Sequence, residues 1–287
     1  MRLGDSEIGD WELRACWIGA IIQSPNLSIP INLAPSQSSI LNLPMIHWLV
    51  QTANENPDIA RGAPPPDLLS EREAAQLATL RVIKRRRDWL LGRWTAKALL
   101  QQALAEKRLS LTQILIDNDA DGAPFASIEN RGRLQRLDWS LSISHSHGAA
   151  FCAAHPASGR EERYAIGADL EFIEQREANF VQDYFTAVEA ERVSLASPGA
   201  RDAVITGIWS AKEAALKALR TGLRLSTRRI ECLLPGLLPA DDVWHPFTLH
   251  APDEATPGVS WSGWWRRPVQ HPDFVMTLVI KTEESDQ

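Results

Sequence analysis

Cysteine is scarce in this sequence. The three cysteines, Cys16, Cys152 and Cys232, lie far apart, and each has apolar neighbours. None has a second cysteine at the short spacing that a thiolate metal site needs, so the sequence favours neither a structural zinc site nor a disulfide framework. We expect buried free thiols in a reducing compartment.

Long hydrophobic runs and basic surplus are also missing. No stretch approaches the roughly 20 apolar residues that a membrane-spanning helix needs. The N-terminus is acidic and amphipathic, so we expect neither a signal peptide nor a membrane partner, and cytoplasmic residence is the default. The net charge of −6 argues against a dedicated nucleic-acid binder. With 44% hydrophobic residues, the 287-residue chain can bury the core of one large domain or two smaller ones.

Helical and extended patterns alternate along the chain. Residues 23–67 are rich in Pro, Ser and Asn, which predicts a loop-dominated stretch. At Ser70 a capping-box pattern begins, and residues 74–105 have a helical pattern with an expected break near Gly92. Further segments are predicted as short strands (137–154 and 164–171, with a turn at 156–159), as helices (180–195 and 203–220) and as a strand-rich tail that ends in 274–280.

The sequence contains an internal echo at an offset of 115 residues. Trp94 and Lys97 match Trp209 and Lys212, and Thr95 stands opposite Ser210. The other matches are Gly92 with Gly207, Ala96 with Ala211, Ala103 with Ala218 and Leu104 with Leu219, and at an offset of 116 Leu69-Ser70 and Glu73 mirror Phe185-Thr186 and Glu189. Two copies of one helical unit would explain this better than chance similarity, because Trp is rare. The copies would then pack as a pseudo-dimer around a cleft.

Paired carboxylates mark the first motif with chemical content, Ile166-Gly167-Ala168-Asp169-Leu170-Glu171. Residues two apart on a strand share a face, so Asp169 and Glu171 would point the same way. A cation bridging them would offset their repulsion, and Mg²⁺ prefers such oxygen ligands. A solvated strand face is the alternative.

The second motif is Trp209-Ser210-Ala211-Lys212-Glu213-Ala214-Ala215-Leu216-Lys217. Glu213 and Lys217 are four apart and share a helix face, so they could offer a carboxylate to a metal ion and an ammonium to a phosphate. An ordinary surface ion pair is the alternative. Ala98 stands where the second copy has Glu213, so the echo predicts one asymmetric site.

Two further motifs could contact phosphate. In Leu141-Ser142-Ile143-Ser144-His145-Ser146-His147-Gly148, a strand ends at a histidine that can donate a hydrogen bond, while zinc binding by His-x-His would need ligands that do not follow. Arg86, Arg93 and Lys97 lie within roughly one helix face, with Arg85 close to it, and could bind phosphate, although a solvated helix face is the usual explanation of such a run.

Together, in this order, these motifs resemble the Sfp-type group of 4'-phosphopantetheinyl transferases from about residue 68 to 220. The resemblance is specific where Gly-Ala-Asp-Leu-Glu precedes Phe185-Thr186-x-x-Glu189 and then Trp-Ser-x-Lys-Glu-x-x-x-Lys. It implies an α+β fold of two similar subdomains related by a pseudo-twofold axis, with the active site between them. The boundaries would be 1–160, on the coenzyme A side, and 161–287, which carries the metal carboxylates.

The resemblance also implies roles for single residues. Asp169, Glu171 and Glu213 would hold Mg²⁺, and Glu213, Asp169 and Lys217 would be catalytic. The residues that would contact coenzyme A are Ser144, His145 and Lys217 at its phosphates, Arg85, Arg93 and Lys97 at the 3'-phosphate, and Gly122 and Pro124 on the adenine side. The family usually has Gly-Lys-Pro in this last segment, and this chain has Gly122-Ala123-Pro124.

The implied activity is Mg²⁺-dependent transfer of phosphopantetheine from coenzyme A to a serine of an acyl or peptidyl carrier protein, with release of 3',5'-ADP. The carriers of fatty-acid, polyketide or nonribosomal peptide synthesis are the expected partners, and a monomer is expected. Two other functions remain open at this point. A metal-dependent phosphodiesterase or other hydrolase would use the same carboxylates with water as the nucleophile, and a non-catalytic carrier-binding module would lack the reaction altogether.

Overall fold

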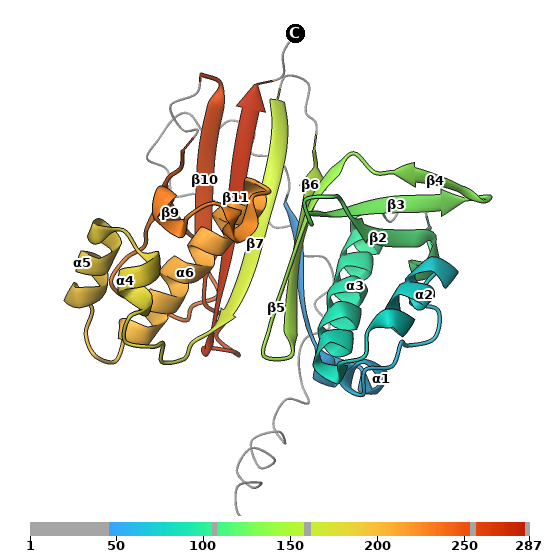
Figure 1. Ribbon diagram of the computed structural model, residues 1–287, viewed down its shortest axis with the longest axis horizontal. Coiled ribbons are helices and arrows are strands. Elements are labelled where there is room, and N and C mark those ends of the chain that lie inside the picture. The colour runs from blue at the N-terminus through green and yellow to red at the C-terminus, as the bar shows by residue number, and fades with distance from the viewer. Residues whose placement is uncertain (1–45, 105–107, 158–161, 253–256, 285–287) are drawn as a thin grey trace, which may run out of the picture.

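The protein has a mixed α/β architecture in which helices flank antiparallel sheets (Figure 1). A computed structural model describes residues 46–104, 108–157, 162–252 and 257–284. The sheets, in strand order, are β1 (His47–Thr52), β6 (Ala149–Pro156) and β5 (Trp139–Ser146); β2 (Ile114–Asn118), β3 (Pro124–Asn130) and β4 (Arg133–Arg136); and β7 (Glu162–Phe172), β11 (Phe274–Glu284), β10 (Val259–Arg266), β9 (His245–His250) and β8 (Glu231–Leu233). The helices are α1 (Pro57–Ala60), α2 (Glu71–Thr79), α3 (Ile83–Ala103), α4 (Phe180–Tyr184), α5 (Ala187–Leu195) and α6 (Arg201–Ala218).

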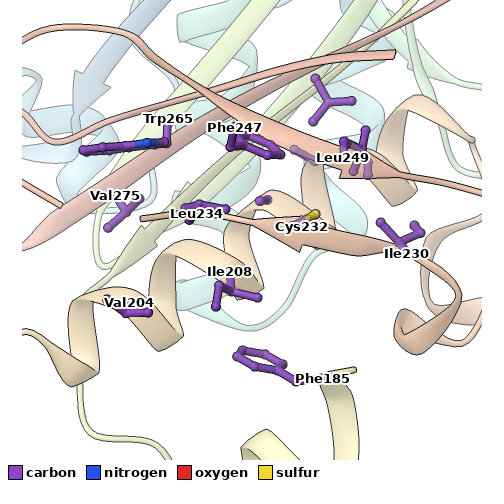
Figure 2. Close-up of a cluster of buried hydrophobic side chains, with 14 of the residues drawn as sticks. Phe185, Val204, Ile208, Ile230, Cys232, Leu234, Phe247, Leu249, Trp265 and Val275 are labelled. Atoms are coloured by element: carbon purple, nitrogen blue, oxygen red, sulfur yellow. The ribbon is translucent and has the colours of Figure 1, made fainter. Parts of the chain in front are cut away.

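Side-chain alternation along the strands divides the core into layers. On β11, Met276 and Leu278 pack with Phe151 of β6 in a cluster between the five-stranded sheet and the sheet of β1, β6 and β5. Val275 and Val279 of the same strand point the other way and pack against α6. Figure 2 shows this second cluster, in which residues of α6 meet side chains from the strands of the five-stranded sheet. On the opposite side of the molecule, α3 covers β2, β3 and the outer face of β5 and β6.

β5 and β7 lie side by side at the edges of their sheets, and serine side chains join them. Ser140 Oγ accepts a hydrogen bond from Ile166 N at 2.8 Å, and Ser142 Oγ accepts one from Ala168 N at 2.9 Å. Further along, Ser146 Oγ accepts from the backbone N–H of Phe172 at 3.4 Å. These serines recur at every second position of β5, so they share one face of the strand. We call this contact the β5–β7 junction.

α6 packs directly on the other side of β7. A Cβ atom placed on Gly167 would lie 1.8 Å from the backbone oxygen of Ala214. This glycine therefore allows the helix backbone to touch the strand. The close approach brings the carboxylates of β7 next to the polar side chains of α6.

The internal echo has a counterpart in the interactions of two buried lysines. Lys97 Nζ lies 2.5 Å from Glu73, which belongs to the capping box begun by Ser70. Lys212 Nζ lies 2.7 Å from Glu189, which belongs to the capping box begun by Thr186. Each glutamate also accepts a backbone N–H from a strand, that of Ile116 at 3.2 Å for Glu73 and that of Cys232 at 2.7 Å for Glu189. The same buried network is thus built twice.

Several elements differ from the sequence-based predictions. The predicted loop over 23–67 contains β1, which completes its sheet by pairing with β6; residues 1–45 lie outside the described residues. The predicted helix break at Gly92 is wrong, because α3 runs through this residue and the break falls at 80–82. Gly92 is instead a packing position, since a Cβ atom there would lie 3.1 Å from Ile143 Cγ2.

Other predictions are confirmed. Strands occupy most of 137–154 and 164–171, and α6 covers most of 203–220. Cys152 and Cys232 are buried free thiols, while Cys16 lies outside the described residues. Within the described part of the chain, no helix combines the length and the apolar character needed to cross a bilayer.

We expect Gly167→Ala to destabilise the protein by about 3 kcal/mol or more, because the added methyl group can be accommodated only if α6 and β7 move apart. The midpoint of urea unfolding, compared with that of the wild-type protein, measures the effect. Gly199→Ala is the matched control, since nothing lies within 4 Å of its Cβ position. Equal stability of the two variants would contradict this account of the strand–helix contact.

His155 predicts a pH dependence of stability. Its side chain is fully buried on β6, and burial, with a smaller effect of His47, lowers its pKa to about 4. The unfolded chain binds this proton near pH 6.5, so stability should be lost as the pH falls from about 6.5 towards 4. Relative to His155→Phe, the free energy of unfolding of the wild-type protein should fall by on the order of 3 kcal/mol across this window. Urea unfolding at several pH values measures this difference. A difference between the two proteins that stays constant with pH would argue against it.

Candidate active site

Asp169 is the centre of a group of polar side chains beside the β5–β7 junction. Its Oδ1 atom accepts hydrogen bonds from Lys217 Nζ at 2.7 Å and from Ser144 Oγ at 2.8 Å. Lys217 Nζ also donates to the backbone oxygen of Ala168 at 3.0 Å. The Oδ2 atom of Asp169 is buried and has no hydrogen-bond partner within the described parts of the chain. Because a buried carboxylate oxygen is costly to leave unpaired, this atom is suited to a ligand.

Glu171 lies two residues further along the same strand. Burial, followed by repulsion from Asp169, raises its pKa to about 7, against the opposing effect of Arg176. Arg176 Nη2 donates to Glu171 Oε2 at 3.0 Å. Glu171 is therefore a carboxylate whose negative charge is only partly compensated by its neighbours.

Glu213 reaches the group from α6. Burial and then repulsion from Asp169 raise its pKa, and Lys217 opposes this shift. The described residues offer Glu213 neither a hydrogen bond nor an ion pair. Asp169 thus lies close enough to repel the charge of both glutamates, as three carboxylates around a cation would do.

The three carboxylates suit a metal ion better by their chemistry than by their separation. No group of three or more His, Cys, Asp and Glu side chains stands at metal-binding separation in the described ranges. The ligand set Asp169, Glu171 and Glu213 stays a prediction. The donors themselves fit Mg²⁺, because they are carboxylate oxygens, two of them have raised pKa values, and Asp169 Oδ2 has no protein partner.

A cavity of about 260 Å³ is lined by residues of all three sheets and reaches Lys217. Its walls come from β5, β7, the end of α6 and the turn between β2 and β3. Three residues predicted from the sequence to serve the site, Gly122, Pro124 and Lys217, line this cavity. A pocket that draws its walls from sequence segments about 100 residues apart is a common form of ligand site.

The turn before β3 has a defined conformation. Gly122 has φ +91°, which favours glycine, and its N–H donates to Asp119 O at 2.8 Å. The N–H of Ala123 donates to Asp121 Oδ1 at 3.1 Å. The turn therefore lines the cavity with Asp121, Gly122, Ala123 and Pro124, and Ala123 adds no cation.

The remaining predicted residues lie elsewhere. Lys97 is fully buried, and its ammonium group bonds to Glu73 and to the backbone oxygen of Leu68. Arg93 is also buried, and its guanidinium lies 3.6 Å from the ring centre of Trp89. Arg85 is exposed on α3, and His145 is half exposed with its Nδ1 atom 4.0 Å from Asp88. None of these four residues is among those that line the cavity.

The cavity is also lined by residues that were not predicted from the sequence. Ser140 and Ser142 line the cavity from the β5–β7 junction, beside Trp139. Arg136 and Arg220 line it as well, from two segments that lie far apart in the sequence. The alternating serines over 140–146 were visible in the sequence, but nothing near Arg136 or Arg220 indicated a shared location.

The two lysines of the second motif differ in role, and substitution should separate them. Lys212 is fully buried with Glu189, so Lys212→Met should cost about 3–5 kcal/mol by leaving that carboxylate unpaired. Lys217→Met should destabilise the protein less, because Lys217 is 28% exposed, so that water can reach the space it leaves, and Asp169 keeps its hydrogen bond from Ser144. Urea unfolding of both variants measures the difference. Equal losses would contradict a purely structural role for Lys212.

Comparison with known proteins gives three results. Residues 165–241 match the family model of the 4'-phosphopantetheinyl transferase superfamily. This segment contains Asp169, Glu171, Glu213 and Lys217. The crystal structure of holo-ACP-synthase from Plasmodium yoelii is similar with 19% sequence identity and a TM-score of 0.29, over 38% of this chain and 90% of that chain. A search of curated proteins returned no significant match.

Proposed function

We propose that this protein is a Mg²⁺-dependent phosphopantetheinyl transferase, which moves the phosphopantetheine group of coenzyme A to a serine of an acyl or peptidyl carrier protein. The observation that carries the proposal is the arrangement around Asp169. Its Oδ1 atom is held by Lys217 and Ser144, its Oδ2 atom has no partner within the described residues, and Lys217 borders the cavity. The segment that matches the superfamily supplies this aspartate and lysine.

We further infer that the chain has the Sfp-type organisation, with two similar subdomains, 1–160 and 161–287, about a pseudo-twofold axis. The two buried networks of Lys97 with Glu73 and of Lys212 with Glu189 support this inference. A single chain with two such halves needs no second copy to form the cleft, so a monomer is expected.

The carboxylates would hold the metal ion. Asp169, Glu171 and Glu213 are the proposed ligands of Mg²⁺, which, when bound, would neutralise charge on the phosphate oxygens. Lys217 would contact the same oxygens through its ammonium group, which Asp169 and Ala168 O keep in position. Ser144 would orient Asp169 through the 2.8 Å hydrogen bond rather than bind substrate directly.

The reaction would be a displacement at phosphorus. The hydroxyl oxygen of the carrier serine would form a bond to the β-phosphorus of coenzyme A, and the bond to the leaving 3',5'-ADP would break. Glu213, which makes no hydrogen bond with the described residues, would accept the proton of the serine. Gly122 and Pro124 would border the nucleotide in the cavity.

Two of the phosphate contacts predicted from the sequence are not part of this proposal. We do not propose Lys97 or Arg93 as ligand contacts, because both are buried and Lys97 is engaged with Glu73. Arg85 stays a prediction, since it is exposed on α3 away from the cavity lining. His145 is exposed at the end of β5 and remains available to a ligand that extends beyond the cavity.

The proposal is tested by incubating the protein with coenzyme A, Mg²⁺ and a carrier protein. The wild-type protein should add about 340 Da to the carrier, as measured by mass spectrometry of the intact carrier. Glu213→Gln should lower the rate by about a hundredfold or more without changing the unfolding midpoint, because it removes a metal ligand and a proton acceptor together. Glu191→Gln, at an exposed position of α5, is the control that should keep the wild-type rate.

Two results would contradict the proposal. One is wild-type turnover in Glu213→Gln. The other is release of free phosphopantetheine without modification of any carrier, which would identify a hydrolase.

A further inference from the structure

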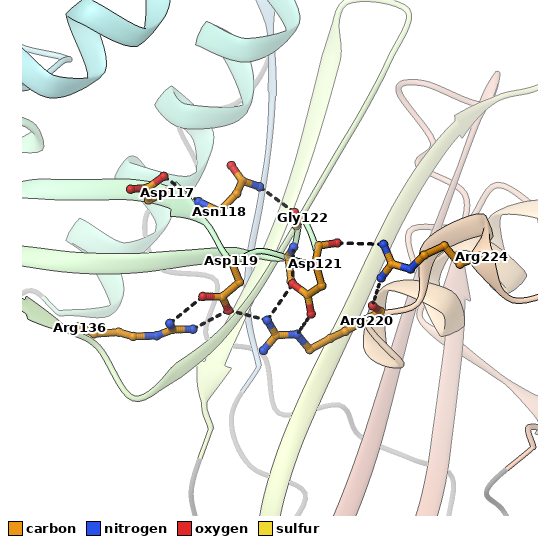
Figure 3. Close-up of polar contacts among 9 residues, drawn as sticks. Asp117, Asn118, Asp119, Asp121, Gly122, Arg136, Arg220 and Arg224 are labelled. Atoms are coloured by element: carbon orange, nitrogen blue, oxygen red, sulfur yellow. Dashed lines mark hydrogen bonds and ion pairs between the residues drawn. The ribbon is translucent and has the colours of Figure 1, made fainter.

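Five charged residues meet beside the cavity, and they come from segments about 100 residues apart in the sequence. We call them the rim cluster: Asp119, Asp121 and Arg136 from the β2–β4 region, and Arg220 and Arg224 from the segment after α6 (Figure 3). Asp121, Arg136 and Arg220 line the cavity itself. The proposed metal carboxylates do not belong to this cluster.

Asp119 holds two guanidinium groups at once. Arg136 donates to both of its carboxylate oxygens, each at 2.8 Å. Arg220 Nη2 donates to Asp119 Oδ2 at 2.5 Å. One carboxylate thus aligns an arginine of β4 with an arginine that follows α6. Both guanidinium groups are oriented toward an anionic oxygen, as they would be in a phosphate site.

Arg220 is held in one orientation. Its Nε and Nη2 atoms donate to Asp121 at 2.9 and 3.0 Å, and Arg224 Nη2 donates to its backbone oxygen at 2.9 Å. The Nη1 group has no protein acceptor among the described residues, so its two hydrogens remain available to a ligand. Arg220 also has φ +59°, a left-handed conformation that is unfavourable for a side chain with a Cβ atom.

Stability alone does not explain the rim cluster. Arg220 and Arg136 are half exposed, and exposed ion pairs contribute little to folding. A glycine would suit the backbone of position 220 better than arginine does. Arg136 is also fixed from below, because its guanidinium lies 4.0 Å from the ring centre of Phe125. The rim cluster holds three arginines and two aspartates, so one positive charge is left over and the two oriented guanidiniums can bind an anion at low entropic cost.

We propose that Arg136 and Arg220 bind a phosphate group of the ligand and determine its specificity, while Asp119 and Asp121 orient them. This inference rests on the proposed function. In the proposed function, Lys217 and the metal ion contact the diphosphate of coenzyme A. The phosphate on the ribose is then the anionic group that remains for the rim cluster. Guanidinium groups match phosphate oxygens in geometry and charge.

The test compares coenzyme A with dephospho-coenzyme A, which lacks only that phosphate, by isothermal titration calorimetry on the full-length protein. The wild-type protein should bind coenzyme A at least about tenfold more tightly, the size expected for a charge-assisted contact. In Arg220→Gly and in Arg136→Gln, the two dissociation constants should approach each other. Arg220→Gly should keep its fold, because glycine tolerates the left-handed backbone.

Arg72→Gln is the matched control. It also removes one exposed arginine that pairs with an aspartate of β2, but that pair lies within one half and outside the cavity lining. This variant should keep the wild-type preference. Thermal unfolding of all variants shows whether each one is folded.

The outcomes separate this inference from the proposed function. A wild-type protein without preference between the two ligands, or folded Arg220 and Arg136 variants that keep the full preference, would overturn the role of the rim cluster. If the protein shows the expected preferences but modifies no carrier, the phosphate receptor stands and the transferase assignment fails. If the protein modifies a carrier but binds coenzyme A and dephospho-coenzyme A equally tightly, the role of the rim cluster is overturned and the transferase assignment stands.

Discussion

β7 lies between β5 on one side and α6 on the other, and both contacts depend on small side chains. The serines of β5 bond to backbone groups of β7, while Gly167 lets the backbone of α6 touch the strand. Asp169 is placed by the same two contacts, because Ser144 reaches it from β5 and Lys217 reaches it from α6. The candidate active site therefore exists only where the two halves of the chain meet, and neither half could form it alone.

Residues that look alike in the sequence serve different purposes in the structure. Lys97 and Lys212 are buried in equivalent ion pairs with Glu73 and Glu189, which join a helix cap to a strand. Lys217 lies one helical turn beyond Lys212 and reaches the cavity. Removing one partner of such a buried pair leaves an uncompensated charge, so each pair constrains how its helix cap and strand pack. These two pairs thus belong to the framework, whereas the residues proposed for chemistry, Glu213 and Lys217, have no match in the first segment of the echo.

Negative charge gathers around Asp169, while arginines gather in the rim cluster. Around Asp169, the carboxylates of Glu171 and Glu213 have raised pKa values, which favours a cation. Among the residues that line the cavity, Arg136 and Arg220 share Asp119, and their guanidiniums lower the pKa of this aspartate to about 2. A ligand that carries two separate phosphate-bearing groups would match this distribution when a divalent cation accompanies one of them. Coenzyme A, the proposed substrate, carries a diphosphate and a separate phosphate on its ribose.

Local features of the fold can be predicted from the sequence alone. They are the capping boxes at Ser70 and Thr186, the strand that carries Asp169 and Glu171, and the helix that carries Glu213 and Lys217. These follow from short-range patterns of caps, alternation and helical spacing. The helical spacing of Arg93 and Lys97 also suggested a phosphate site, but burial against α2 decided otherwise. Only the tertiary structure joined Arg136 to Arg220 and Ser144 to Asp169, because contacts between distant segments depend on packing that no local pattern encodes.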